Sequence, residues 1–457
     1  MSATETAIAG IRDIVGDRIT RSASVREQHG TDTSWHAPHP PEAVVFAHST
    51  EEVSRIVAIC AEQSVPVIAY GAGSSVEGHV GALEGGICID VGEMNQVLRV
   101  SAEDLDVTVQ PGVTRKQLNT HLRDTGLFFP IDPGADASIG GMAATRASGT
   151  NAVRYGTMKE NVLGLTAVLP DGQVIRTGSR ARKSSAGYDL TGLFVGSAGT
   201  LGIFTEITLR LHGIPEAISS AVCAFRSIEG AVDTVIQTIQ SGIPIARIEL
   251  LDEVQMDALN RYSKFDYPLM PTLFLEFHGT QAGVKEQAEM VQASAADNGG
   301  SGFAWATDAE ARSRLWQARH DALWADLALR PGSQAFPTDV CVPISALAQC
   351  IRETKRDLEQ SFLQAPLVGH VGDGNFHVVM LVDRNSPEEV AEARRLNDRM
   401  VGRALDMGGT CTGETGVGVG KMKFMRREHG AGIDTMWVIK RAIDPLNIMN
   451  PGKILPE

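Results

Sequence analysis

The sequence has no apolar run long enough to cross a membrane, and its cysteines are not spaced as the ligands of a metal ion or an iron–sulfur cluster would be. A spanning helix needs about 20 predominantly apolar residues, and the 457-residue chain has no such run. This pattern predicts neither a disulfide framework nor an iron–sulfur cluster, and it suits a reducing compartment. The six cysteines lie at positions 60, 88, 223, 341, 350 and 411, without a CxxC pair.

Positive charge is also scarce. Lys and Arg number 41 against 55 Asp and Glu, which gives a formal net charge of −14. This balance argues against nucleic acid and against an anionic membrane surface as the main partner. The first residues, MSATETAIAGIRDIVGDRI, lack a signal-peptide core and contain acids that transit peptides avoid. We therefore expect a cytoplasmic protein without a membrane span, at most peripheral to a membrane.

Glycine is abundant but unevenly distributed. The length predicts two or three domains, and a hydrophobic content of 43% describes a globular chain. The 47 glycines crowd residues 71–92, 134–202 and 369–420, whereas residues 215–368 alternate helical segments with short strands. A strand that ends at LHGIPE, residues 211–216, predicts a domain boundary there.

The first glycine-rich segment reads VPVIAYGAGSSVEGHV. An apolar strand over 67–70 runs into Gly71, Ala72, Gly73, Ser74 and Ser75. Glycines let a backbone approach phosphate closely, and their N–H groups can hold a pyrophosphate. The segment matches neither a Walker loop nor a GxGxxG helix start. By itself it favours an ordinary tight turn over a phosphate loop.

Two further segments, 128–175 and 183–211, shift that balance. Both are rich in glycine and small residues, and the second ends in an alternating strand, as in GTLGIFTEITLRL. Small residues in this arrangement suit a long, flat ligand that lies along the backbone.

A pair of histidines brackets an Asp-Gly sequence in VGHVGDGNFHVVM, residues 368–380. Asp-Gly between strand-like flanks predicts a two-residue hairpin turn at Asp373 and Gly374. That register places His370 directly opposite His377, close enough for both imidazoles to hold one metal ion. Two histidines on an ordinary hairpin are an equally good interpretation until a third ligand is found.

The three glycine-rich segments, in this order, resemble the FAD-binding domain of the vanillyl-alcohol-oxidase superfamily. The resemblance is strongest to its branch of D-lactate dehydrogenases, D-2-hydroxyglutarate dehydrogenases and glycolate oxidase subunits, and it extends from PEAVVFAHSTEEVSRIV to DPLNIMNPGKILP. It implies an α+β protein with a two-subdomain FAD-binding domain and an α/β substrate (cap) domain with an antiparallel sheet. We expect the FAD-binding domain at 1–215, the substrate domain at 216–410, and a C-terminal segment at 411–457 that returns to the FAD-binding domain.

The resemblance also implies the cofactor site. Covalent-flavin relatives place a histidine in the first glycine loop, where this chain has Ser74, so the FAD is expected to be non-covalent, and His79 just beyond is expected to be structural. Ile203 would approach the cofactor through its backbone, and Asn450 would make a C-terminal contact. The remaining residues expected to line FAD are Gly71, Ala72, Gly73, Ser75, Pro133, Gly134, Ser138, Gly141, Gly149, Asn151, Tyr155 and Gly156.

A third metal ligand follows from the same resemblance. GHVGDGNFH and CTGE match the branch's metal motif, so His370, His377 and Glu414 would bind one divalent ion, Zn²⁺ or Mn²⁺. From its own segment alone, Glu414 is a solvated turn residue. Asn375 would complete the polar shell. Arg319, in LWQARHDALW, lies where the family's substrate arginine lies, although helix arginines are usually surface residues.

Two positions depart from the family pattern. The family usually reads TGEHG, and its histidine is taken as the base for the substrate hydroxyl, whereas this chain has Thr415. A neutral hydroxyl is a poor base at pH 7. The family often has a lysine in the segment before TDVCVP, where this chain has Gln334. Both replacements reduce positive charge near the expected substrate.

The resulting expectation is an FAD-dependent dehydrogenase that oxidises a D-2-hydroxy acid, with D-lactate as first choice. Reduced FAD would pass electrons to a cytochrome, a quinone or an electron-transfer flavoprotein, and a homodimer is a compatible assembly. One alternative is a subunit of a glycolate- or D-2-hydroxyglutarate-oxidising system that needs a partner. Another is a metal hydrolase built on His370, His377 and Glu414, which leaves the glycine-rich first half unexplained.

Overall fold

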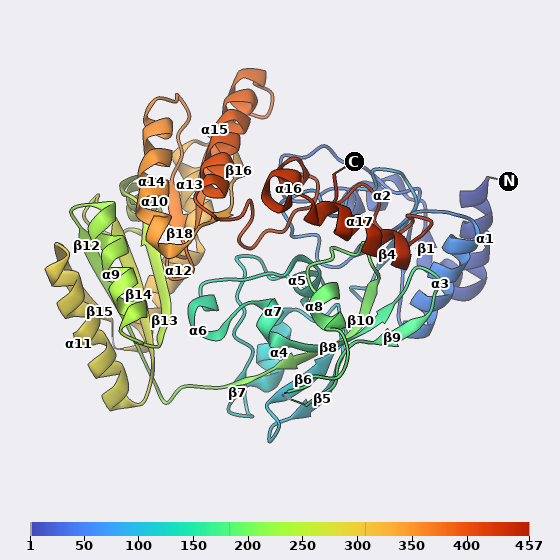
Figure 1. The fold of residues 1–457 in the computed structure, drawn as a ribbon, viewed down its shortest axis with the longest axis horizontal. Helices are drawn as coiled ribbons and strands as arrows, with labels where there is room; N and C mark the ends of the chain where they lie inside the picture. Colours follow the sequence, from blue (N-terminus) through green and yellow to red (C-terminus); the bar gives the residue numbers. More distant parts are fainter. Residues whose placement is uncertain (1, 182, 307, 457) are drawn as a thin grey trace. The chain divides into compact units, whose positions relative to one another are not determined.

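The computed structural model describes residues 2–181, 183–306 and 308–456 (Figure 1). Its contacts divide the chain into two compact units. Unit 1 comprises Met1–Ser148, Gly156–Ile214 and Glu414–Glu457, and unit 2 comprises Gly149–Tyr155 and Pro215–Gly413. The expected domain limits, 1–215, 216–410 and 411–457, stay a prediction.

Unit 1 begins with a small sheet of strand order β1-β2-β4-β3, in which β2, β4 and β3 are parallel. These strands are almost continuously apolar, as expected for a parallel sheet covered on its faces. The strands are β1 (Ile19–Thr20), β2 (Ala43–Phe46), β3 (Val67–Tyr70) and β4 (Ile87–Asp90), and the helices are α1 (Ala3–Val15), α2 (Ala23–His29) and α3 (Thr50–Glu62), with a 3₁₀ turn at Gly16–Arg18.

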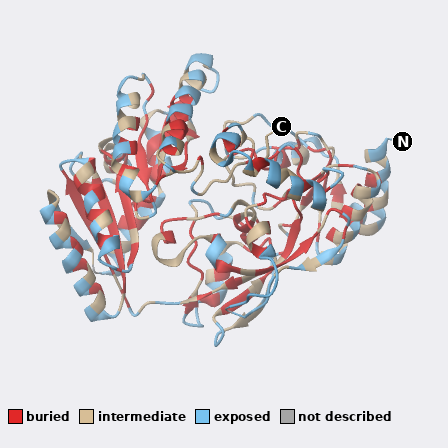
Figure 2. Cartoon of the chain, viewed as in Figure 1, coloured by how far each residue is buried: buried red, intermediate tan, exposed pale blue. Residues whose placement is uncertain are grey.

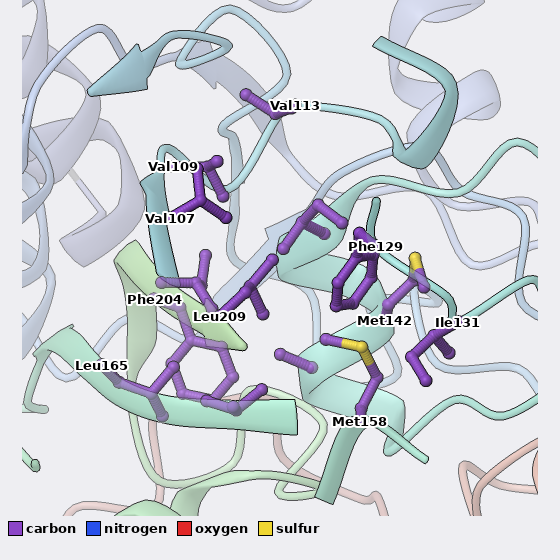
Figure 3. Packing of buried hydrophobic residues seen from close by; sticks show 14 of the residues in the cluster. Val107, Val109, Val113, Phe129, Ile131, Met142, Met158, Leu165, Phe204 and Leu209 are labelled. Carbon is purple, nitrogen blue, oxygen red and sulfur yellow. The ribbon is translucent and has the colours of Figure 1, made fainter. Parts of the chain in front are cut away.

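The second sheet of unit 1 is antiparallel, with strand order β5-β6-β10-β8-β9. Its inner face packs on α5 and the preceding loops around fully buried Phe129, Ile207 and Leu209 (Figure 3). The strands are β5 (Val97–Ser101), β6 (Asp106–Val109), β8 (Val162–Val168), β9 (Val174–Arg176) and β10 (Ile203–Arg210), while β7 (Leu127–Phe128) pairs with β11 (His212–Gly213).

The C-terminal segment of unit 1 returns to β3. Met449 bridges Val67 in parallel, and Asn450 N donates to Val67 O at 2.8 Å. This contact fixes the backbone of the segment against the strand that leads into the first glycine loop. The remaining helices of unit 1 are α4 (Arg115–Leu122), α5 (Ile139–Thr145), α7 (Met158–Asn161), α8 (Leu190–Phe194), α16 (Met422–His429) and α17 (Gly432–Ile443).

Unit 2 contains a mainly antiparallel sheet of strand order β15-β12-β14-β13-β18-β19-β16, with β17 paired to β19. Its central strands are buried along most of their length (Figure 2). The strands are β12 (Ala217–Phe225), β13 (Ile245–Leu251), β14 (Thr272–Gly279), β15 (Gly300–Ala306), β16 (Gln334–Pro337), β17 (Val340–Cys341), β18 (Leu367–Gly369) and β19 (Asn375–Val382).

One face of this sheet changes from apolar to polar along the strands. Leu251 and Phe274 pack into a cluster with residues of α10 and α12. Glu249 precedes Leu251 by two residues on β13, and Glu276 follows Phe274 by two residues on β14. Because alternate residues of a strand share a face, both acids lie on the same face as this cluster. The buried site residues therefore extend from an apolar core. The helices are α6 (Ala152–Tyr155), α9 (Ile228–Gln240), α10 (Glu253–Ser263), α11 (Gln281–Asp297), α12 (Ala309–His320), α13 (Ala322–Leu329), α14 (Ile344–Glu359) and α15 (Pro387–Asp406).

Candidate metal and flavin sites

The histidine hairpin has a different register from the one predicted. Val368 pairs with His377 and Leu367 with Val378, so His370 is not the ladder partner of His377, and the two-residue turn was wrong. Asp373 N donates to His370 O and Gly374 N to Val371 O, which closes a longer loop over 370–374. The shift is two residues, and because side chains alternate with period two, both imidazoles keep the same face. Their ring centroids lie 5.3 Å apart.

Hydrogen bonds fix the tautomer of both rings. His377 Nδ1 lies 2.9 Å from Thr338 O, and a carbonyl can only accept, so Nδ1 carries the proton. His370 Nδ1 lies 2.7 Å from Glu249 Oε1 and donates to it in the same way. In a neutral imidazole the other nitrogen then carries the lone pair. Each histidine therefore presents Nε2 as a potential ligand atom, the arrangement found in carboxylate- or carbonyl-supported metal sites.

Glu249, on β13, links the histidine pair to Arg319 on α12. Arg319 Nε and Nη2 donate to Glu249 Oε2 at 3.0 and 2.7 Å, while the other carboxylate oxygen accepts from His370. Burial would raise the pKa of Glu249, but the charge of Arg319 and the hydrogen bonds from His370 and Arg319 outweigh it, so that pKa lies below its ordinary value. Arg319 is only 9% exposed, so it is not one of the solvent-exposed arginines that are usual on helices.

Asn375 and Gly413 lie in contact beside the histidine pair of unit 2. Asn375 Nδ2 donates to Asp339 Oδ1 and to Val340 O, both at 2.7 Å. A Cβ at Gly413 would lie 2.2 Å from Asn375 Nδ2, so only glycine lets the chain pass so close. Glu414 is bonded directly to Gly413, and one ligand atom from each of His370, His377 and Glu414 lies within 4.8 Å of the others.

The two departures from the family pattern are differently placed. Thr415, in unit 1, donates from Oγ1 to Glu77 Oε1 at 3.3 Å. Glu77 is 5% exposed and was not among the predicted site residues. Gln334 opens β16 and is exposed. Of the two positions, Thr415 therefore has the direct contact with a buried acid.

The first glycine loop lies directly against Ser138 at the start of α5. The Ser138 hydroxyl accepts from Ala72 N at 3.3 Å and from Gly141 N at 3.4 Å. A Cβ at Gly71 would lie 2.3 Å from Ser138 Oγ, and Gly73 has φ +62°. Gly71 is thus required by the close approach of the Ser138 side chain and Gly73 by its positive φ, and Ala72 N faces the start of α5.

Several buried polar atoms of unit 1 have no hydrogen-bond partner among the described residues. Asn450 uses Nδ2 to donate to Ala198 O at 2.7 Å, but Asn450 Oδ1 and Ser197 Oγ have no acceptor or donor there. His79 Nδ1 lies 3.2 Å from Ser75 Oγ, and burial lowers the pKa of His79 to about 4. Burying an unpaired polar atom is costly. These atoms and the glycine loop fit a polar cofactor such as FAD.

The other expected FAD residues are spread over both units. Asn151 Oδ1 accepts from Arg247 Nε at 3.0 Å, and Tyr155 Oη lies 2.8 Å from His278 Nδ1, all in unit 2 with Gly149. The further positions, all in unit 1, are Pro133 and Gly134 in a loop, Gly156 with φ +77°, and buried Ile203 at the start of β10. Their cofactor contacts stay predictions.

Sequence reasoning missed Glu249 and Asp339. Glu249 had a detectable signal, because Arg247 and Glu249 are the only charged residues in the mostly buried strand IARIELL, and a buried acid needs a partner. Asp339, the acid of TDVCVP, had no comparable signal, since a short polar stretch between strands is usually a solvated loop.

Comparison with known proteins decides the family. Residues 214–454 match FAD linked oxidases, C-terminal domain, and residues 41–178 match an FAD binding domain. The chain belongs to the FAD-linked oxidase family. FAD is therefore the cofactor of this FAD-linked oxidase, and the resemblance to the vanillyl-alcohol-oxidase superfamily is confirmed.

The oxidase is similar to several curated proteins over nearly its whole length. It is 54% identical to "Probable D-lactate dehydrogenase, mitochondrial" of Danio rerio, over 99% of this chain and 92% of that protein. It is 50% identical to "D-lactate dehydrogenase [cytochrome], mitochondrial" of Arabidopsis thaliana, over 98% and 80%. "Glycolate oxidase subunit GlcD" of Bacillus subtilis is 34% identical, over 91% and 89%.

The oxidase also shares its fold with a solved flavoenzyme. A p-cresol methylhydroxylase structure aligns with a TM-score of 0.79 and 20% identity, over 99% of this chain and 96% of that one. The likeness is one of fold alone, and it confirms the expected fold class. In the described part of the chain, no helix combines the length and apolarity that crossing a bilayer requires.

Proposed function

We propose that this FAD-linked oxidase oxidises a D-2-hydroxy acid to the 2-oxo acid, with D-lactate as its substrate. Two observations carry the proposal. One ligand atom from each of His370, His377 and Glu414 lies within 4.8 Å of the others. Buried Glu249 holds both His370 and the buried Arg319. The names of the Danio rerio and Arabidopsis thaliana relatives support the choice of D-lactate.

The ligand set suits a divalent metal ion. Two imidazole nitrogens and one carboxylate match Zn²⁺ and also Mn²⁺, and both rings are held in the ligating tautomer by Thr338 O and Glu249. A bound ion would supply positive charge that favours loss of the substrate hydroxyl proton, and FAD supplies the acceptor for two electrons. Residues 71–75 with Ser138 and Asn450 would hold FAD non-covalently, since the loop 71–75 offers no histidine for a covalent link.

Arg319 would orient the substrate carboxylate. Its Nε and Nη2 are engaged by Glu249, which fixes the guanidinium plane and prevents the side chain from swinging to solvent. A guanidinium in a fixed plane can bind a carboxylate with defined geometry, as an ammonium cannot. Asn375, held by Asp339 and Val340, would limit how the substrate turns about that carboxylate.

A cytochrome is the proposed electron acceptor, because the Arabidopsis thaliana relative carries that word in its name. A quinone or an electron-transfer flavoprotein would be the alternative. The 34% identity to a glycolate oxidase subunit favours, as second candidate, a subunit that needs a partner for turnover. A cytoplasmic location and a homodimer stay predictions, and the two D-lactate dehydrogenase relatives above are named mitochondrial.

Anaerobic titration tests the proposal. The flavin absorbance of the purified holoprotein is followed while D-lactate, L-lactate, glycolate or D-2-hydroxyglutarate is added. We expect rapid bleaching with D-lactate, slow bleaching with the L form, and reoxidation by a dye acceptor without a second subunit. Bleaching by glycolate alone, or bleaching without dye turnover, would favour the second candidate. No bleaching by any 2-hydroxy acid would overturn the proposal.

A further inference from the structure

His29 is a buried histidine in unit 1 with an acceptor at each ring nitrogen. It ends α2, and its side chain is 4% exposed. Nδ1 lies 2.8 Å from Val25 O, and Nε2 lies 2.9 Å from Asp90 Oδ2 at the end of β4. A carbonyl only accepts, so Nδ1 must donate to Val25.

The second hydrogen bond then requires a second proton. A neutral imidazole with its proton on Nδ1 would present the Nε2 lone pair to the Asp90 carboxylate, which has no proton to give when ionised. Asp90 Oδ1 also accepts, from Gly92 N at 2.6 Å. Burial would lower the pKa of His29, but the hydrogen bonds to Asp90 and Val25 outweigh it, and the net shift is upward. The pair is an imidazolium and a carboxylate.

This pair supports the strand that leads into the first glycine loop. The His29 ring packs on the Tyr70 ring, with centroids 4.3 Å apart, and Tyr70 pairs with Asp90 in the parallel register of β3 and β4. The Tyr70 hydroxyl lies against Gly73, where an added Cβ would come within 2.2 Å of it. The ion pair, the tyrosine and the loop are therefore in continuous contact.

We propose that the His29–Asp90 ion pair is a positioning element for the glycine loop 71–75, so that FAD affinity depends on the charge of a residue outside that loop. The proposal rests on the FAD site proposed above. Loss of the imidazolium proton would place a lone pair against Asp90, push His29 from Tyr70 and loosen the loop. Two phosphate charges at the loop would also favour the imidazolium by Coulomb attraction.

The sign of the effect follows by linkage. FAD binding raises the pKa of His29 further, so affinity is complete below the pKa of the apoprotein and falls as pH rises through the pKa of the holoprotein. The elements around the ring contribute Asp90, the neutral Tyr70 phenol, Phe46 and the Cys88 thiol. Burial raises the pKa of Tyr70 to about 12 and that of Cys88 well above its ordinary value, so neither titrates near neutrality.

Lys453, also in unit 1, is a second group that could change charge in this range. It donates to Gly81 O at 2.6 Å, and burial lowers the pKa of its ammonium to about 8. A pH dependence in the wild type alone would therefore not identify His29. Variants of the ion pair, with Lys453 left in place, separate the two.

The test measures the Kd and the dissociation rate of FAD from the purified protein between about pH 6 and about pH 9.5, a range that spans the imidazole transition. In the wild type we expect the Kd to rise at least about tenfold across this range, which corresponds to a pKa difference of one unit. His29→Gln should have the weaker affinity at low pH, should approach the wild type at high pH and should lose the His29 transition. Asp90→Asn keeps the imidazole but removes its anion, so the midpoint should move to lower pH.

His48→Gln is the matched control. His48 follows β2 and meets Glu93, but both side chains are about half exposed, so its replacement should leave Kd and midpoint unchanged. If His29→Gln does not fold, the midpoint of Asp90→Asn decides. Equal midpoints and Kd values in the wild type and the ion-pair variants would overturn the inference while leaving the FAD site intact. Failure of the wild type to bind FAD at any pH would instead overturn the proposed site.

Discussion

Thr415 stands where the resemblance predicts a histidine that accepts the proton of the substrate hydroxyl, and its own hydroxyl donates to Glu77. We expect Thr415→His to raise kcat on D-lactate at least about tenfold, since a missing general base costs about 10²–10⁴-fold. The gain should appear as pH rises through the pKa of the new imidazole, about 6.5 before the Glu77 carboxylate raises it. Steady-state kinetics across pH check this.

Thr415→Val is the matched control, because it removes the hydroxyl at nearly constant volume. Unchanged kinetics in that variant would show that the hydroxyl takes no part in proton transfer. If Thr415→His gives no gain while the wild type is fast, another group accepts the proton. Thr415 would then be a residue that selects the substrate.

Arg319 is predicted to bind the substrate carboxylate through the planar, two-pronged face of its guanidinium. Arg319→Lys should raise KM for D-lactate at least about tenfold, about 1.4 kcal/mol, because an ammonium loses both the planar contact to carboxylate and the double contact to Glu249. Arg314→Lys on the same helix is the control, since Arg314 stacks on Phe265 at 4.7 Å outside the site. An unchanged KM in Arg319→Lys would leave Arg319 with a structural role only.

Asp326 is a buried acid that the proposed mechanism does not use. Gln255 Nε2 donates to Asp326 Oδ1 at 2.7 Å, while Asp326 Oδ2 and Gln255 Oε1 have no partner among the described residues. A proton on Oδ2 would turn that acceptor into a donor for the amide oxygen. Burial accordingly raises the pKa of Asp326 from 3.8 to about 7.

The stability of the protein should therefore fall as pH rises through about 7. The raised pKa means that the folded state holds the proton, so the stabilisation is complete below about pH 4, the unfolded pKa, and is lost above the folded pKa. A difference of about three units corresponds to about 4 kcal/mol. Asp326→Asn should remove this part of the pH dependence in urea unfolding at about pH 5 and pH 8.5. Asp257→Asn, on the exposed side of α10, should not, and equal slopes in all three proteins would contradict the assignment.

At the scale of the element, the β18–β19 hairpin carries two of the three proposed metal ligands, His370 and His377. His377→Ala should lose the bound metal and at least about 10²-fold in kcat/KM, as expected when a group that stabilises developing charge is removed. FAD content should stay nearly unchanged, because the loop 71–75 is a different segment. Metal analysis and the flavin spectrum measure both, with exposed His429→Ala as control. Full metal content in His377→Ala would exclude the proposed ligand set.

The hairpin also shows where local reasoning stops. Asp-Gly correctly indicated a turn, but the loop spans 370–374, because β17 and β13 pair with the hairpin strands and fix their lengths. The two-residue error left the histidines on one face, so the ligand pair could be predicted although its register could not. The glycine loop was likewise detectable, whereas its contact with Ser138 spans 66 residues of sequence.

At the scale of the whole molecule, the cofactor gives the plainest prediction. The protein should purify yellow and release intact FAD on acid precipitation, because the loop 71–75 offers no histidine for a covalent link. Absorbance of the supernatant and of the washed pellet measures the partition. Flavin that stays with the precipitated protein would contradict the role assigned to Ser74.

The sequence by itself indicated the family and the cofactor through the resemblance of its glycine-rich segments, and the candidate ligands through the resemblance of GHVGDGNFH and CTGE, because such motifs are residue types at fixed local spacing. Glycines at 71 and 73, histidines at 370 and 377, and an acid at 414 are visible without coordinates. Local pattern also predicted the apolar strand at 67–70 and the alternating strand that ends the segment 183–211, which are β3 and β10, since strand alternation follows from backbone geometry.

Only the tertiary structure decided the partners. Glu249 on β13 joins His370 and Arg319 across 121 and 70 residues of sequence, and His29 reaches Asp90 across 61. Such pairs depend on which strands and helices become neighbours, and local spacing carries no record of that. The charge of His29 and the tautomers of the two ligand histidines therefore follow from long-range contacts rather than from residue identity.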